Sequence, residues 1–161
     1  MINDLKLDDI DWKIIELLAA DGRISFSAVG RAVGLSAPAA AERVRRLEEA
    51  GVINGYHAQI DPRLLGYGVQ VYIEAKVPAQ RYRFFKKTVA EIGAVQECHH
   101  ITGQAAFLLR VWLKKVADLE PILGRLSRFG ETSSTIVLST VVEKQPFVPS
   151  ASFSTHPPLE R

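Results

Sequence analysis

Cysteine is almost absent from this sequence, which holds a single one, Cys98. One cysteine excludes an intramolecular disulfide and a metal site built from several cysteines, and it suits a reducing compartment. The sequence also lacks a run of roughly 18 or more apolar residues. Its first residues carry neither the basic nor the apolar stretch of a secretory signal. We therefore expect a protein of the cytoplasm that enters no membrane.

Motifs of the common enzyme classes are missing as well. The sequence has no glycine-rich phosphate loop, no Gly-x-Ser-x-Gly elbow and no recognisable set of nucleophile, base and orienting residue. His99 and His100 are adjacent, but His57 and His156 are remote in sequence, and no set of His, Cys, Asp and Glu residues with the spacing of metal ligands surrounds the pair. We expect no metal and no other cofactor. The chain is interpreted as a binding protein and not an enzyme, although a sheet domain can host an activity that no motif reports.

Charge is nearly balanced over the whole chain, with 20 Lys and Arg against 18 Asp and Glu and a net charge of +2. Residues 1–60 hold seven basic and nine acidic residues, a net charge of −2. The two signs are nevertheless segregated, because the segment from Gly22 to Arg46 contains five arginines and one acid, Glu42. Separated charge of this kind is what a one-sided contact with phosphates requires.

The N-terminal part has the pattern of two helices. Apolar residues recur at helical spacing from about Asp8 to Ala20, and Asp21–Gly22 supplies a stop. Ser25 or Ser27 caps a second, short helix. That helix ends at Gly34, because glycine readily adopts the left-handed conformation of a helix end.

A third helix is predicted from its N-cap, Ser36, to Gly51. Its residues Ala40, Val44 and Leu47 recur at i, i+4 and i+7 and therefore face inward. Two short helices joined by a glycine-containing turn form a helix-turn-helix, whose second helix reads DNA. The outward face is small near its start, which permits close approach to base edges. The residues expected at the DNA are Ser25, Ser36, Ala37, Pro38, Ala39, Glu42, Arg43, Arg45 and Arg46.

The arginines of this helix have two interpretations. In the first, Arg45 and Arg46 contact phosphates or a guanine edge, and Ser36 contacts a phosphate through its hydroxyl or its N–H group. In the second, the arginines form a solvated face paired with Glu42, Glu48 and Glu49.

The second half of the chain has the pattern of a small sheet domain. Residues 52–60 predict a strand and residues 61–68 a connector. Alternating apolar residues predict a strand over 69–77, and tightly joined strands over 95–101 and 105–113 predict a hairpin. One helix carries Tyr82, Phe85, Val89 and Ile92 on one face, a second carries Leu119, Ile122, Leu123 and Leu126, and a last strand covers about 132–142.

The resulting order, βαββαβ, predicts a four-stranded antiparallel sheet with both helices on one face, the ferredoxin-like arrangement. The fold class is therefore α+β, with a three-helix helix-turn-helix domain at the N-terminus. Cys98 is expected to be a small packing residue beneath the sheet. Tyr72, Phe107 or Leu108, Trp112 and parts of Val137 to Val142 leave the other sheet face partly apolar, which indicates a partner, most simply a second copy of the chain. We expect a DNA-binding domain over 1–60, a connector over 61–68, a regulatory and oligomerisation domain over 69–144, and an extended tail over 145–161.

Several short motifs occur together in this sequence. They are Leu7-Asp8-Asp9-Ile10-Asp11, Asp21-Gly22-Arg23-Ile24-Ser25, Gly34-Leu35-Ser36, Glu42-Arg43-Val44-Arg45-Arg46-Leu47-Glu48, Gly51-Val52-Ile53, Gly55-Tyr56 and Gly103. With these motifs the sequence resembles the Lrp/AsnC (leucine-responsive, feast/famine) family of prokaryotic transcription regulators over residues 7–142. The resemblance implies a RAM-type βαββαβ domain that dimerises through its sheet, assembly of dimers into octamers or discs, and small effectors, commonly amino acids, bound between dimers.

The resemblance also implies an effector-binding loop. Within this loop, the sequence differs from the common family pattern at one position. Where the family commonly has an aspartate that holds the effector's ammonium group, this chain has Ala106. An amino acid would lose roughly 1.5–3 kcal/mol without that charge-assisted hydrogen bond, or one to two powers of ten in affinity. The effector residues expected by resemblance are Ile101, Thr102, Gly103, Gln104 and Ala106, with the hydroxyls of Thr132 and Ser134.

The sequence thus predicts a DNA-binding transcription regulator. Its expected partners are double-stranded DNA, further copies of itself as a dimer or octamer, and a small effector such as an amino acid, and no membrane. The alternative is an effector-sensing or assembly module without strong DNA binding.

Overall fold

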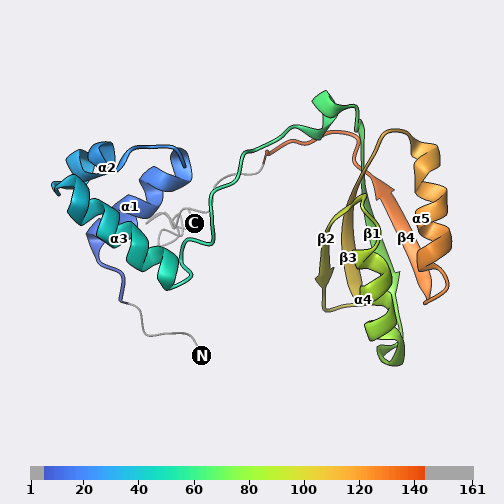
Figure 1. The fold of residues 1–161 in the computed structure, drawn as a ribbon. Helices are drawn as coiled ribbons and strands as arrows, with labels where there is room; N and C mark the ends of the chain where they lie inside the picture. Colours follow the sequence, from blue (N-terminus) through green and yellow to red (C-terminus); the bar gives the residue numbers. More distant parts are fainter. Residues whose placement is uncertain (1–5, 144–161) are drawn as a thin grey trace, which may run out of the picture. The chain divides into compact units, whose positions relative to one another are not determined.

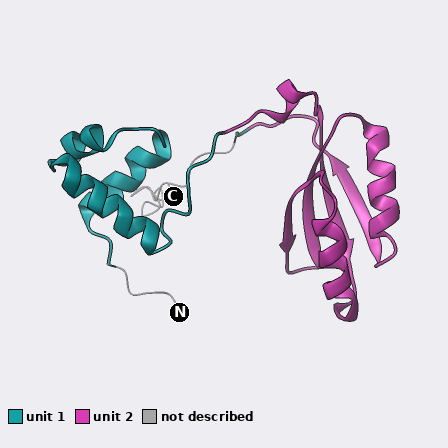
Figure 2. Ribbon diagram, viewed as in Figure 1, with its two compact units in different colours: residues 1–58, 142–161 teal, residues 59–141 magenta. Residues whose placement is uncertain are grey.

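The structure is a computed structural model that describes residues 6–143. The chain divides into two compact units (Figure 2). Within the described residues, unit 1 consists of residues 6–58 with 142–143, and unit 2 consists of residues 59–141. The extended tail predicted over 145–161 lies outside the described residues.

Unit 1 is built from three helices, α1 (Asp9–Ala20), α2 (Phe26–Val33) and α3 (Ala37–Glu49) (Figure 1). Ser36 caps α3 as predicted, because its side chain accepts the backbone N–H of a residue in the first turn. Of the two serines proposed to cap α2, Ser25 is the cap.

The core of unit 1 is the place where the three helices meet. Ala40, Val44 and Leu47 on α3 are buried, as their spacing predicted, together with Ile14 of α1 and Val29 of α2. The opposite side of α3 is therefore the side that faces solvent.

The strand predicted over residues 52–60 is wrong. The chain leaves α3 through a turn in which the N–H groups of Val52 and Ile53 donate to the Leu47 carbonyl at 2.9 and 3.1 Å. The Tyr56 hydroxyl then donates to Glu48 Oε1 at 2.9 Å. A strand needs a neighbour with which to exchange backbone hydrogen bonds, and no other segment of residues 6–143 pairs with this one.

Unit 2 contains one four-stranded antiparallel sheet in the order β2-β3-β1-β4, which is the ferredoxin-like arrangement predicted from the sequence. Its elements are β1 (Val69–Lys76), α4 (Tyr82–Ala90), β2 (Val95–His100), β3 (Phe107–Leu113), α5 (Leu119–Leu126) and β4 (Glu131–Ile136).

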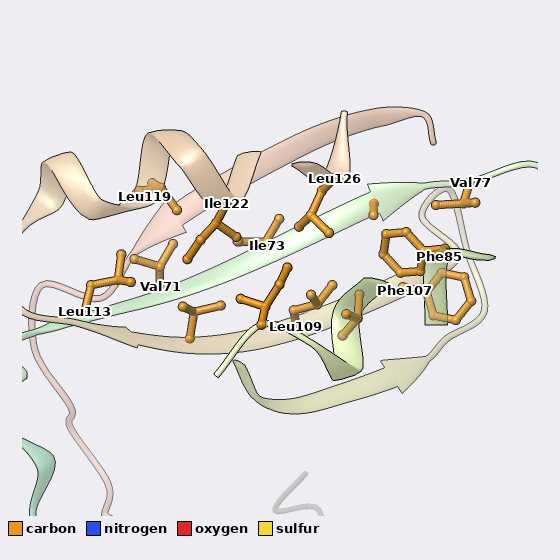
Figure 3. Close-up of a cluster of buried hydrophobic side chains, with 14 residues drawn as sticks. Val71, Ile73, Val77, Phe85, Phe107, Leu109, Leu113, Leu119, Ile122 and Leu126 are labelled. Atoms are coloured by element: carbon orange, nitrogen blue, oxygen red, sulfur yellow. The ribbon is translucent and has the colours of Figure 1, made fainter. Parts of the chain in front are cut away.

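One face of this sheet carries the core of unit 2. Val71, Ile73 and Ala75 of β1 point to this face, where they pack with Phe85 of α4 and Leu126 of α5 (Figure 3). The intervening residues of β1 are exposed, because successive side chains of a strand point to opposite faces. Both helices therefore cover the same face, as predicted.

The open face is only partly apolar. Register with β1 places Leu108, Arg110 and Trp112 of β3 on this face, opposite Glu74, Tyr72 and Gln70. Of the two alternatives in the sequence, Leu108 and not Phe107 points to the open face, since Phe107 is buried in the core.

Two expectations at the edges of the sheet are corrected. Strand β4 ends at Ile136 and does not reach 142, because β1 begins at Val69 and offers no partner beyond the bond from Val137 N–H to the Gln70 carbonyl. Cys98, expected beneath the sheet, is exposed because it lies on the edge strand β2. Across residues 6–143, the helices are all too short or too polar to cross a membrane.

The turn into β4 depends on Gly130. A Cβ atom there would come within 1.9 Å of the Lys76 carbonyl oxygen and 2.9 Å of its carbon. Because backbone atoms cannot swing aside as a side chain does, we expect Gly130→Ala to lower the free energy of unfolding by about 1–3 kcal/mol.

The matched control is Gly124→Ala in α5, where a Cβ would meet nothing within 4 Å. Alanine favours a helix over glycine by about 1 kcal/mol, so this variant should be as stable as the parent or more stable. Urea unfolding followed by circular dichroism measures both. Equal stability of the two variants would contradict this view of the turn.

Candidate nucleic-acid interface and effector pocket

The turn between α2 and α3 is held by a close backbone contact. Gly34 ends α2 in the left-handed conformation, with φ of 73°, and the Leu35 N–H donates to the Gly30 carbonyl at 2.8 Å. Gly30 is buried, and a Cβ there would lie 2.6 Å from the Leu35 carbonyl oxygen. Glycine at this position therefore lets α3 start close to α2. Gly30 was not predicted from the sequence as a residue of this turn.

The first turn and a half of α3 presents small side chains to solvent. Pro38 is exposed, while Ala37, Ala39 and Ala41 are half-buried. The Ser36 hydroxyl accepts the Ala39 N–H at 3.3 Å. No charged side chain occurs on α3 before Glu42, so another molecule can approach this part of the helix closely.

Arg45 is held between two carboxylates of its own helix. Its guanidinium donates to both oxygens of Glu42 and to Glu49, one turn before and one turn after it. The hydrogen bond from Arg45 lowers the pKa of the Glu42 carboxyl, and the same bond is the main reason why the pKa of Arg45 is raised. The solvated-face interpretation thus describes Arg45 in this structure.

Arg43 connects α3 to the start of α1. Its Nη1 lies 2.8 Å from Asp8 Oδ2 and 2.7 Å from Asp11 Oδ1. Asp8 and Asp11 also cap α1 reciprocally, each accepting the other's backbone N–H. Asp11 is the one charged residue of the described range that is buried, and a buried carboxylate requires such a partner. The side chain of Arg43 therefore links α3 to α1 through these ion pairs.

Three arginines of unit 1 form no ion pair with any residue in the range 6–143. They are Arg46 on α3, Arg31 on α2 and Arg23 in the preceding turn, and all three are exposed. Of these, only Arg46 was expected at DNA from the sequence. A sequence signal for Arg31 existed, because no acid lies three or four residues away from it on either side.

The loop from Ile101 to Ala106 closes one end of unit 2. Its ends are tied by the Ile101 N–H, which donates to the Ala106 carbonyl at 2.9 Å, and by the Ala106 N–H, which donates to the Ala75 carbonyl at 3.0 Å. Gly103 has φ of 116°, a conformation that favours glycine.

This loop lines a pocket of about 590 Å³, which we call the loop pocket. Five predicted effector residues lie together there, and the loop faces Lys76, Val77, Pro78 and Tyr82 across the pocket. The predicted residues are Ile101, Thr102, Gly103, Gln104 and Ala106. The lining includes one cation, Lys76, and no carboxylate.

The other two predicted effector residues lie elsewhere in this single chain. Thr132 and Ser134 are on β4, paired with Ala75 and Ile73 of β1. Thr132 lines a different groove, beside α5, and neither residue lines the loop pocket.

Comparison with known proteins matches both units to one family. Residues 7–48 match the AsnC-type helix-turn-helix domain, and residues 70–147 match the Lrp/AsnC ligand binding domain. The HTH-type transcriptional regulator LrpC of Bacillus subtilis is 33% identical over 140 residues, which cover 87% of this chain and 97% of LrpC. The chain belongs to the Lrp/AsnC family of transcription regulators.

Solved structures agree with the assignment of this chain to the Lrp/AsnC family. The structure of B. subtilis LrpC superposes with a TM-score of 0.81 and covers 87% of this chain and all of that one, 100%. A transcriptional regulator from Neisseria meningitidis in complex with L-Met has a TM-score of 0.82 at 24% identity, covering 88% of this chain and 96% of that one, and shows the shared fold. The protein is thus an HTH-type regulator with an effector-binding domain.

The link between Arg43 and Asp8 makes the stability of unit 1 depend on pH. The Asp11 N–H and the Arg43 guanidinium hold the pKa of Asp8 below its ordinary value of 3.8. A lowered pKa contributes stability above pH 3.8, and this contribution is lost as the pH falls further through the folded-state pKa. We expect Arg43→Gln to lower the melting temperature at neutral pH, with a smaller difference from the parent below pH 3.8.

The control is Arg31→Gln, which removes the same charge from unit 1 where no acid is paired with it. Its melting temperature should differ from that of the parent by a small amount that does not depend on pH. Thermal unfolding at a series of pH values measures all three proteins. A pH-independent loss in Arg43→Gln would contradict the role of the ion pair.

Proposed function

We propose that this Lrp/AsnC regulator lays the start of α3 into the major groove of double-stranded DNA and contacts phosphates with arginines on either side. The observation that carries the proposal is the small, uncharged surface of Ala37, Pro38 and Ala39, together with the ion-pair-free side chains of Arg31 and Arg46. Small residues allow contact with base edges, including the methyl group of thymine, while arginines supply charge to the backbone.

The remaining predicted residues have distinct proposed roles. Ser25 and Ser36 stand at helix N-termini, where free N–H groups favour a phosphate. Arg45 reaches DNA only if its bonds to Glu42 and Glu49 open, and Arg43 sets the position of α3 through α1.

The regulator is proposed to act as a dimer or a larger assembly such as an octamer. Tyr72, Leu108 and Trp112 on the open sheet face offer apolar surface to a second copy. Two copies related by a twofold axis would present two α3 helices to successive half-sites of an operator. A protein with this role works beside the chromosome in the cytoplasm and catalyses no reaction.

The loop pocket is proposed as the effector site. We propose that the charge of its lining determines which small molecules it binds. Lys76, which also pairs with Glu131 outside the lining, offers a cation to a carboxylate. An ammonium group, in contrast, would find no carboxylate at Ala106 or elsewhere in the lining. Small carboxylic acids therefore fit the pocket better than amino acids do.

DNA binding is tested with the full chain and the DNA upstream of its own gene in a mobility-shift assay. Replacing both Arg45 and Arg46 by alanine should weaken binding and make it less dependent on salt. The slope of log K against log salt concentration should become shallower by about 0.9 for each phosphate that the protein no longer neutralises. Arg46→Ala alone should give most of this change, because Arg46 has no ion pair within residues 6–143.

The matched control is Lys13→Ala, which removes an exposed cation from α1 in the same unit. It should leave affinity and salt slope unchanged. If the parent protein held its upstream DNA no better than competitor DNA, the alternative of a sensor or assembly module without strong DNA binding would replace this proposal.

The effector preference is tested by restoring a carboxylate. Ala106→Asp should increase affinity for amino acids by about one to two powers of ten, the value of one charge-assisted hydrogen bond. Gln104→Glu, which adds a carboxylate elsewhere in the same loop, is the control and should gain less. Thermal shift against a panel of amino acids and small carboxylic acids measures this, and strong amino-acid binding by the parent would contradict the preference.

A further inference from the structure

The sheet unit of this protein is more basic than the helix-turn-helix unit. Residues 59–141 contain 11 Lys and Arg and 7 Asp and Glu, a net charge of +4. Residues 6–58 contain 7 basic and 8 acidic residues, a net charge of −1. A domain that bound only small effectors and further copies of itself would not require this excess of positive charge.

The excess is concentrated on α4 and the turn before it. From Ala79 to Ala90 there are four cations and no acid. Phe85 and Val89 hold one side of α4 in the core. Arg83, Lys86 and Lys87, at i, i+3 and i+4, are neighbours on the surface of α4, and all three are exposed. Lys86 lies on the side toward β2, with its Nζ 5.9 Å from the centre of the Phe107 ring.

Most other cations of unit 2 form an ion pair with a neighbouring acid, whereas Arg83, Lys86 and Lys87 do not. Lys76 pairs with Glu131 at 3.1 Å, Arg110 with Glu97 at 2.6 Å, and Arg125 with Glu91 at 3.4 Å. No residue within 6–143 forms an ion pair with Arg83, Lys86 or Lys87.

Two further arginines extend this charge toward α5. The guanidinium of Arg81 donates to the Arg128 carbonyl oxygen at 2.9 Å and to no carboxylate of the described residues. Arg128 is exposed. Together, Arg81, Arg83, Lys86, Lys87 and Arg128 form what we call the α4 basic surface.

We propose that the α4 basic surface binds the phosphate backbone of DNA that continues beyond the operator. This inference rests on the proposed function, because helix α3 would first hold the same DNA. The surface is a convex helix side and not a pocket, so it suits a line of phosphates better than one small anion. Residues 81–87 span about 9 Å of helix, which matches two to three charges at about 3.4 Å each along one DNA strand.

Tethering makes such contacts effective even if each is weak. Once α3 is bound, phosphates of the flanking DNA stand at a high effective concentration relative to unit 2 of the same chain. Contacts to phosphates carry no sequence information, so the α4 basic surface would add affinity and salt dependence without changing which operator is selected.

The experiment compares two DNA fragments with the same operator, one limited to the footprint of α3 and one extended by about 30 base pairs on each side, roughly three helical turns. The test variant is Lys86→Gln with Lys87→Gln. The control variant is Lys114→Gln with Lys115→Gln, another adjacent and exposed lysine pair of unit 2 that lies outside the α4 basic surface. Fluorescence anisotropy of the full chain at several salt concentrations gives affinity and salt slope.

We expect the Lys86 and Lys87 variant to bind the short fragment as the parent does. On the long fragment its affinity should fall by about tenfold or more, and its salt slope by about 1.8 because two phosphates are no longer neutralised. The control variant should match the parent on both fragments, and all three proteins should melt at the same temperature.

Three results would overturn the proposal. They are an unchanged affinity of the test variant for the long fragment, an equal loss on both fragments, and an equal loss in the control variant. Failure of the proposed function is recognised separately, because the parent would then not bind the short fragment at all.

Discussion

The burial of Ala40, Val44 and Leu47 against α1 and α2 is the contact on which the DNA-binding half of this protein depends. It fixes the rotation of α3, and so it decides which side chains face solvent. The small residues at the start of the helix are thereby presented outward. Gly30 completes the constraint, since only a residue without a Cβ lets the turn after α2 come so close.

Whether an arginine of unit 1 is paired or free to contact another molecule depends on its distance from an acidic side chain. Arg43 reaches back to Asp8 and Asp11 and becomes part of the scaffold, while Arg45 is held by its own helix. Arg31 and Arg46 remain available. Because the unit has a net negative charge, attraction to DNA must come from these local positions and not from the unit as a whole.

Unit 2 is shaped by a sheet with only one covered face. The helices α4 and α5 both bury one side, and neither covers the other. The same geometry places α4 on the outside of the helical layer, where its cations face solvent. At one end of the sheet the loop pocket carries Lys76 and lacks a carboxylate.

Local features were readable in the sequence because their causes are local. The cap at Ser36, the glycine at position 34 and the alternation through β1 each depend on neighbours within a few residues, and each was predicted. Pairing over residues 52–60 was not predictable, because a strand exists only if another segment lies beside it. The burial of Cys98 was wrong for a related reason, since an edge strand has no neighbour on one side.

The sequence by itself therefore determined the family, the three helices of unit 1 and the order of helices and strands in unit 2. Tertiary structure decided which arginines are already paired and which are not. The ion pair between Arg43 and Asp8 joins residues 35 positions apart. Thr132 lines a groove beside α5 and does not line the loop pocket. Ion pairs depend on distances of a few ångströms, and only packing of the whole chain sets those distances.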